Sequence, residues 1–206
     1  MKRYLSILFA LIGWFAVIAQ YFLMIENRIE SIAETTIRFF SFFTILTNTL
    51  VATYFTCLPL PGNKRPEIID KPGTLTAVTV YIVIVGLVYQ VALRHVWQPE
   101  GLQLIVDELL HTIMPVLVIV FWYLYEIKKP VHYSRIQYWA VYPLVYLIYI
   151  LIRGRFSNFY PYPFINVTNL GIGKTLVNAG MVLLVFLAIA TIFIFIGKSV
   201  GKRQAN

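Results

Sequence analysis

Six long apolar stretches are the feature that most constrains this sequence. A helix that crosses the ~30 Å hydrocarbon layer of a bilayer needs about 20 mainly apolar residues. Six segments approach that length, at residues 4–25, 39–60, 74–93, 104–125, 136–152 and 175–196. Charged residues make up 13% of the chain, about half the share usual in soluble domains. The sequence therefore predicts an all-α polytopic membrane protein, in which residues 1–206 form one bundle of six transmembrane helices.

Lysine and arginine are unevenly distributed among the connecting segments. Eleven of the 17 lie before the first stretch, after the sixth, or in the second and fourth loops, and the other six lie in the remaining loops. Cytoplasmic segments carry the excess of positive charge, so we expect both termini in the cytoplasm. Basic loops beside an anionic leaflet also account for the net charge of +8. No nucleic-acid partner is expected.

Polar residues within the predicted helices gather toward the outer leaflet. Ionisable side chains cost at least ~2.5 kcal/mol near the centre of a bilayer, so their usual role is functional. Counted from the ends of the stretches, the outer set comprises Gln20, Thr44, Thr47, Asn48, Gln90, Arg94, Asp107, Glu108, His111, Tyr146, Tyr149 and Asn178. Their common depth predicts one polar site in the outer half of the bundle.

The fourth stretch contains an acid–histidine motif. Asp107 and His111 are four positions apart and Glu108 and His111 three, so either carboxylate can lie beside the imidazole. Such a pair fixes the tautomer and raises the basicity of the ring. Pro115 removes the N–H that would bond the His111 carbonyl, which predicts a kink there. The three side chains are also a possible metal set, but zinc ligand spacing is missing, and we expect no metal and no cofactor.

A hydroxyl group is expected at the depth of His111. Thr44 lies about 5 residues, or ~8 Å, into the second stretch, and His111 about 7 residues, or ~10 Å, into the fourth. A hydroxyl, an imidazole and a carboxylate at one level are the minimum set for acyl transfer. A membrane threonine more often packs or bonds its own helix, and Thr47 is an alternative nucleophile. Candidate oxyanion or substrate contacts are Thr47, Asn48, Gln90, Arg94, Tyr149 and Asn178.

Three short segments resemble a known family. They are Phe-Thr-Ile-Leu-Thr-Asn at 43–48, Asp-Glu-Leu-Leu-His-Thr-Ile-Met-Pro at 107–115 and Tyr-Pro-Tyr-Pro-Phe at 160–164. In this order they resemble the bacterial Pr6Pr family of six-helix membrane proteins. They resemble more distantly the eukaryotic androgen-induced gene 1 family, which includes the androgen-dependent TFPI-regulating protein and whose members are threonine hydrolases of fatty-acid esters of hydroxy fatty acids. The resemblance implies that Thr44 is the nucleophile, that His111 is the base and that Tyr162 lies in a loop at the site.

Two functions follow from these patterns. The first is an intramembrane lipid ester hydrolase in the bacterial inner membrane, in which Thr44 attacks the carbonyl and His111, oriented by Asp107 or Glu108, takes its proton. The second is a lipid-binding or transport protein without catalysis, in which the same polar residues bind a head group. In both, the partner is a membrane lipid or lipid ester.

Overall fold

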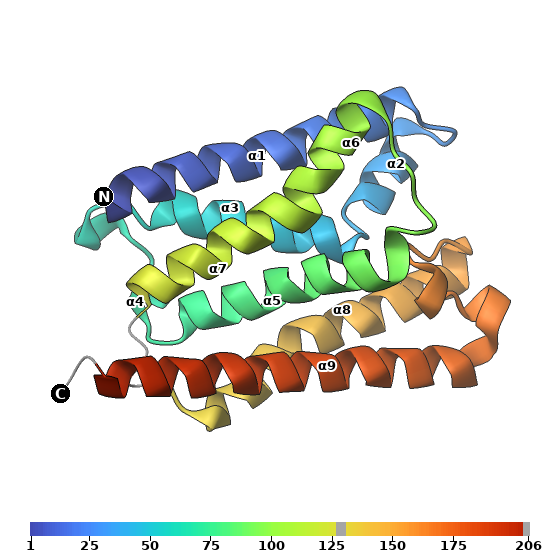
Figure 1. Ribbon diagram of the computed structural model, residues 1–206. Helices are drawn as coiled ribbons and strands as arrows, with labels where there is room; N and C mark the ends of the chain where they lie inside the picture. The colour runs from blue at the N-terminus through green and yellow to red at the C-terminus, as the bar shows by residue number, and fades with distance from the viewer. Residues whose placement is uncertain (127–130, 204–206) are drawn as a thin grey trace.

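The computed structural model describes residues 1–126 and 131–203, and within them the regular structure is entirely helical (Figure 1). The principal helices are α1 (Lys2–Glu26), α2 (Ile32–Phe39), α3 (Phe43–Cys57), α4 (Glu67–Asp70), α5 (Thr74–Val88), α6 (Gly101–Glu108), α7 (Met114–Tyr125), α8 (Ile136–Ser157) and α9 (Val167–Arg203). Two π-helical turns, Tyr89–Leu93 and Leu109–Ile113, continue α5 and join α6 to α7.

The predicted all-helical fold is confirmed for the described residues, and its long apolar helices are compatible with an integral membrane protein. Five helical segments are long and apolar enough to cross a membrane, and the bent pair of α2 and α3 makes a sixth if it counts as one span. The start of α1 and the end of α9 lie at the same end of the bundle (Figure 1). An even number of crossings requires that arrangement. The cytoplasmic location of that end stays a prediction.

The second span differs from the uninterrupted helix expected over residues 39–60. Here α2 ends at Phe39, α3 begins at Phe43, and the two meet at 71°. Two tyrosines of α8 form hydrogen bonds with Ser41 at the break. The Tyr146 hydroxyl donates to the Ser41 carbonyl at 2.9 Å, and the Tyr149 hydroxyl lies 3.1 Å from Ser41 Oγ. Thr44 consequently lies in the first turn of α3 rather than about five residues inside a helix.

The fourth span is disturbed at the position that Pro115 predicts. The residues just before the proline, Leu109–Ile113, form a π-helical turn that contains His111. The neighbouring α5 approaches this turn very closely at Gly86, where an added Cβ would lie 2.9 Å from the His111 carbonyl oxygen. Glycine permits this approach, because a Cβ at this position would crowd the backbone of the facing turn.

The last two spans are longer than the sequence predicts. α8 continues past residue 152 to Ser157, and α9 begins at Val167 with a non-helical Gly171 near its start. Between them, residues 158–166 fold back onto the bundle. Tyr160 packs so tightly against α8 at Gly154 that a Cβ there would overlap the tyrosine ring. This packing fixes the loop that carries Tyr162.

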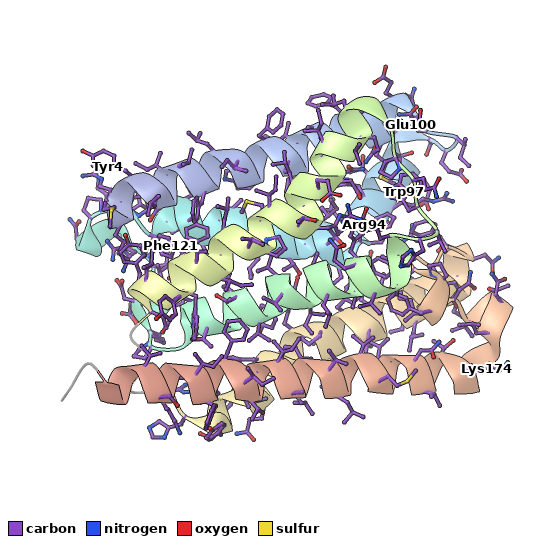
Figure 2. All side chains as sticks on the ribbon, in the orientation of Figure 1. Tyr4, Arg94, Trp97, Glu100, Phe121 and Lys174 are labelled. Carbon is purple, nitrogen blue, oxygen red and sulfur yellow. The ribbon has the colours of Figure 1, made fainter. Side chains whose placement is uncertain are left out.

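The largest apolar cluster joins α1, α3, α5 and α7, and includes the buried residues Phe55, Ile82 and Phe121. Phe121 and Tyr4 lie toward one end of the bundle, and Arg94, Trp97, Glu100 and Lys174 lie at the other (Figure 2). Smaller clusters surround Leu110 and Ile150. The main core thus leaves the second end of the bundle available for a polar site.

Candidate functional site

Two cavities meet near the break between α2 and α3. The larger, which we call the polar cavity, has a volume of about 680 Å³ and is lined by Thr44, Asp107, His111 and Tyr162, together with Gln20, Asn27, Gln103 and apolar neighbours. The smaller, which we call the apolar cavity, has a volume of about 290 Å³ and is also lined by Thr44 and Tyr162. The structure therefore brings together the threonine, the histidine and one carboxylate that the sequence pointed to.

The imidazole of His111 is fixed in one tautomer. Its Nδ1 atom lies 2.9 Å from the carbonyl oxygen of Asp107 and 3.4 Å from Asp107 Oδ1. A carbonyl oxygen can only accept a hydrogen bond, so Nδ1 carries the proton and Nε2 carries the lone pair. The ring also stacks on Tyr89, with centroids 4.1 Å apart and planes 16° from parallel. These two contacts orient the ring and leave Nε2 as the nitrogen that can take up a proton.

Asp107, rather than Glu108, is the carboxylate beside the histidine. Asp107 is 5% exposed, and its Oδ2 atom has no hydrogen-bond partner among the described residues. Glu108 instead pairs with Arg94, whose guanidinium also donates to Gln90 Oε1 at 2.7 Å. A buried carboxylate at this distance can stabilise positive charge on the imidazole, and the Tyr89 hydroxyl also interacts with the Asp107 side chain. Of the two carboxylates that the sequence left open as partners of His111, the geometry favours Asp107.

Thr44 lies in the first turn of α3, where backbone N–H groups lack partners within the helix. The hydroxyl of Tyr162 accepts from the Thr44 N–H at 3.2 Å and lies 3.3 Å from Thr44 Oγ1. Tyr162 reaches this position from the loop before α9, more than a hundred residues along the chain. The nucleophile candidate and this tyrosine therefore form a direct contact in the wall between the two cavities.

Thr47 and Asn48 support the site from the side of α3. Thr47 is fully buried, its Oγ1 lies 3.1 Å from the Tyr142 hydroxyl, and it is not among the described lining residues of either cavity. Asn48 donates to the carbonyls of Thr44 at 2.9 Å and Leu110 at 3.2 Å. Asn48 thus joins α3 to the π-helical turn of His111. The geometry favours Thr44 over Thr47 as the reacting hydroxyl.

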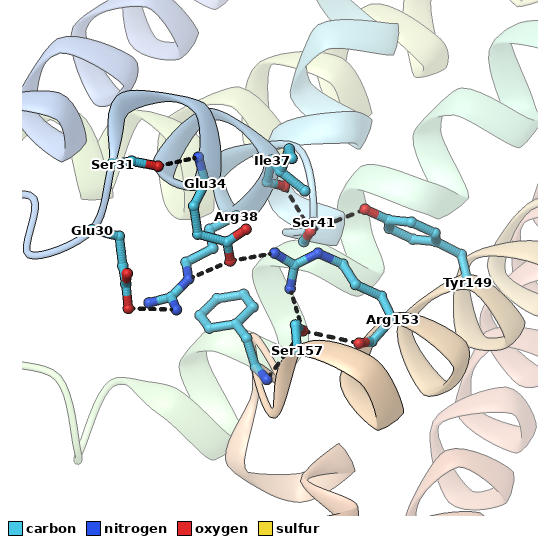
Figure 3. Close-up of polar contacts among 10 residues, drawn as sticks. Glu30, Ser31, Glu34, Ile37, Arg38, Ser41, Tyr149, Arg153 and Ser157 are labelled. Carbon is cyan, nitrogen blue, oxygen red and sulfur yellow. Dashed lines mark hydrogen bonds and ion pairs between the residues drawn. The ribbon is translucent and has the colours of Figure 1, made fainter.

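Ion pairs between α2 and α8 (Figure 3) and the ring of Phe159 hold the start of the loop that carries Tyr162. Glu34 accepts from Arg38 at 2.8 Å and from Arg153 at 2.7 Å, which joins α2 to α8. The ring of Phe159 lies 4.7 Å from the Arg38 guanidinium and 5.0 Å from that of Arg153. Cation–π contacts of this kind contribute about 0.5–1 kcal/mol each at exposed sites. These contacts therefore fix the loop a few residues before Tyr162.

The other candidate residues have partners away from the reacting groups. Gln90 donates to Thr112 at 2.9 Å, Tyr149 contacts Ser41, and Asn178 donates to the carbonyl of Phe164 at 2.9 Å. Among the residues described as lining the two cavities, none of these three appears, nor does Arg94. Their contacts indicate structural roles around the site.

Sequence reasoning missed Tyr89 and Gln103, among other contributors. Tyr89 stacks on His111, and Gln103 donates to Gln20 at 2.8 Å in the wall of the polar cavity. Tyr89 directly precedes Gln90, which was selected for its depth, but an aromatic residue in an apolar helix usually indicates packing. Gln103 lies before the predicted start of the fourth stretch, and the observed start at Gly101 brings it into the site.

Within residues 1–126 and 131–203, no group of three His, Cys, Asp or Glu side chains is placed to hold a metal ion. No protein-family model, curated protein or solved structure matches this chain. The functional argument accordingly depends on the geometry of the site and on the residues that form it.

Proposed function

We propose that this protein is an integral membrane hydrolase that cleaves lipid esters inside the bilayer, with Thr44 as nucleophile and His111 as general base. The observation that carries the proposal is the polar cavity of about 680 Å³, which Thr44, His111 and Asp107 line together. A hydroxyl, a neutral imidazole and an orienting carboxylate are the groups that nucleophilic acyl transfer needs. The resemblance to the Pr6Pr and androgen-induced gene 1 families supports the same pair of residues.

In the proposed reaction, Thr44 Oγ1 attacks the ester carbonyl carbon while His111 Nε2 takes the hydroxyl proton. The imidazolium, stabilised by Asp107, passes this proton to the departing alkoxide. Tyr162 is the candidate oxyanion donor, since its hydroxyl lies within 3.3 Å of Thr44 Oγ1 and both residues line the same cavity. Water then attacks the acyl-threonine, and His111 transfers a proton from that water back to Thr44 Oγ1.

We place the site in the outer half of a bacterial inner membrane. The polar cavity is lined by the last turns of α1 and the first turns of α6. It therefore lies at the end of the bundle opposite to the start of α1 and the end of α9 (Figure 1). The excess of Lys and Arg in the segments predicted to be cytoplasmic supports this orientation.

The second candidate is a lipid-binding protein without catalysis. One observation favours it: among the described residues, no hydrogen bond joins Thr44 to His111, because Thr44 contacts Tyr162 and Asn48 instead. Catalytic hydrogen bonds are often longer before substrate binds, so the lack of a hydrogen bond between Thr44 and His111 among the described residues is compatible with both functions. A direct assay separates them.

The test uses the purified protein with a fluorophosphonate label and with p-nitrophenyl dodecanoate, alongside the matched variants Thr44→Val and Thr47→Val and the variant His111→Ala. Valine keeps the shape of threonine and removes its hydroxyl. We expect Thr44→Val and His111→Ala to lose labelling and hydrolysis, and Thr47→Val to retain both. Wild-type protein that neither labels nor hydrolyses the ester contradicts the hydrolase. Loss in Thr47→Val with activity in Thr44→Val contradicts the assignment of the nucleophile.

A further inference from the structure

The apolar cavity offers space for a hydrocarbon chain and little else. Its volume is about 290 Å³, and its wall is formed by α5, α8, α9 and residues beside the α3 break, including Ile84, Leu147, Leu183 and Phe186. Among its described lining residues, none carries a charge or a side-chain amide. The hydroxyls of its other tyrosines, Tyr81 and Tyr146, donate to the carbonyls of Trp139 and Ser41. Apart from the hydroxyls of Thr44 and Tyr162, these walls therefore offer a polar ligand no free hydroxyl proton.

Thr44 and Tyr162 line both cavities. An ester carbonyl held at Thr44 therefore has an apolar space on one side and a polar space on the other. The polar side also contains His111 and Asp107, which the apolar side lacks among its described residues. This asymmetry distinguishes the two halves of an ester.

We propose that the apolar cavity is the binding site for the acyl chain of the substrate, and that the polar cavity takes the alcohol half and then the hydrolytic water. The inference rests on the proposed ester hydrolysis. His111 must protonate the departing alkoxide and then activate water, so the alcohol and the water both need the side on which His111 lies. The acyl chain must stay bound through both steps, which the separate apolar space permits.

Every bond and proton of the proposed hydrolysis is accounted for in this arrangement. The bond from Thr44 Oγ1 to the acyl carbon forms, the bond from that carbon to the alcohol oxygen breaks, and the proton of Thr44 leaves with the alcohol through His111. Once the alcohol has left the polar cavity, water enters the same space. Its oxygen bonds to the acyl carbon, and one of its protons returns through His111 to Thr44 Oγ1. One ester and one water yield one carboxylic acid and one alcohol.

Gly180 of α9 offers a direct test because it lines the apolar cavity, and a Cβ built on it would have no neighbour within 4 Å. Gly180→Leu should therefore fill part of the cavity without displacing backbone. The matched control is Gly173→Leu, on the same helix, which also has no neighbour within 4 Å but is not among the described lining residues.

The first measurement compares kcat/KM for p-nitrophenyl dodecanoate and p-nitrophenyl butyrate. Burial of a methylene is equivalent to about fourfold in affinity, so a leucine that displaces about three methylenes should lower the dodecanoate-to-butyrate ratio about 50-fold. We expect this shift in Gly180→Leu and a ratio within twofold of wild type in Gly173→Leu. An unchanged ratio in Gly180→Leu, or an equal fall in both variants, overturns the inference.

The second measurement assigns the chain to the acyl half. Ethyl dodecanoate and dodecyl acetate are isomers that carry the long chain on opposite sides of the ester. Gly180→Leu should slow hydrolysis of ethyl dodecanoate at least about tenfold more than that of dodecyl acetate. Equal slowing, or greater slowing of dodecyl acetate, overturns the acyl assignment.

Equilibrium binding of radiolabelled dodecanoic acid separates this inference from the proposed function, because binding of the product acid requires no turnover. We expect its Kd to rise about 50-fold in Gly180→Leu and to stay within twofold in Gly173→Leu. If the wild type binds with this pattern but hydrolyses none of the esters, the hydrolase and its acyl assignment fail while the chain site stands. If esters are hydrolysed but the Kd for dodecanoic acid is the same in Gly180→Leu as in the wild type, the chain site fails while the hydrolase stands.

Discussion

Gly86 is the point at which α5 lies against the π-helical turn of His111, and its replacement by alanine tests how closely that turn is positioned. A Cβ at Gly86 would lie 2.9 Å from the His111 carbonyl oxygen and 3.2 Å from Cγ of Pro115, whereas ordinary contact begins at 3.4 Å. The alanine therefore pushes the turn away from α5 by about half an ångström. The obstructing atom belongs to the backbone, so no flexible side chain can absorb the movement.

Two effects of Gly86→Ala should be measurable. Overpacking costs ~1–3 kcal/mol, which in a chain of this size lowers the melting temperature by about 2–12 °C. Misplacement of a catalytic group by ~1 Å costs about 100-fold in rate, so half that movement at His111 should lower kcat/KM for p-nitrophenyl dodecanoate about tenfold. Melting in detergent and steady-state hydrolysis measure the two effects on the same preparation.

Gly13→Ala is the matched control for this prediction. A Cβ at Gly13 would lie 3.1 Å from Ala52 Cβ, so it crowds α1 against α3 without touching the His111 carbonyl. We expect a similar loss of melting temperature with kcat/KM within twofold of wild type. Equal losses of activity in the two variants would refute the positioning argument. Wild-type melting and activity in Gly86→Ala would refute the close approach itself.

Three further variants test the partner of the histidine and the loop of Tyr162. Asp107→Asn should lower kcat/KM for p-nitrophenyl dodecanoate about 10- to 100-fold, because an opposite charge within about 4 Å stabilises the imidazolium by ~1.4–2.8 kcal/mol. Glu108→Gln should change kcat/KM less than twofold, since it breaks only a half-exposed pair with Arg94. Equal losses in the two variants would contradict the assignment to Asp107. Gly154→Ala places a Cβ within the ring of Tyr160, so we expect a loss of ~1–3 kcal/mol in stability by thermal melting and slower fluorophosphonate labelling; labelling at the wild-type rate would show that the loop does not shape the site.

Hydropathy predicted the spans because membrane crossing depends on local composition. The expected stretches at residues 4–25 and 74–93 correspond closely to α1 and to α5 with its π-helical turn. Pro115 likewise acts locally, through the hydrogen bond that it removes, and the sequence predicted the disturbance just before it. The contact between Asp107 and His111 was predictable because residues four positions apart lie on the same face of a helix.

The break between α2 and α3 was not predictable from its own residues. Positions 39–46 are mainly apolar and resemble the middle of an ordinary span. The groups that bond the freed backbone and side chain at Ser41 are the hydroxyls of Tyr146 and Tyr149, which lie more than a hundred positions away. The choice between Asp107 and Glu108 depended in the same way on a distant group, because Arg94 draws Glu108 away from His111.

The position of Thr44 follows from this break. In an unbroken helix the Thr44 N–H would bond the carbonyl of Phe40; because α3 begins at Phe43, it donates instead to the Tyr162 hydroxyl. Backbone freed from a helix at membrane depth is tolerated where it lines a cavity or finds side-chain partners, and Thr44 meets both conditions. The break thus gives Thr44 Oγ1 access to the cavity of His111 and places a hydroxyl donor beside it. A continuous second span would place Thr44 among its own helical hydrogen bonds, so the proposed chemistry depends on the residues of α8 that hold the break open.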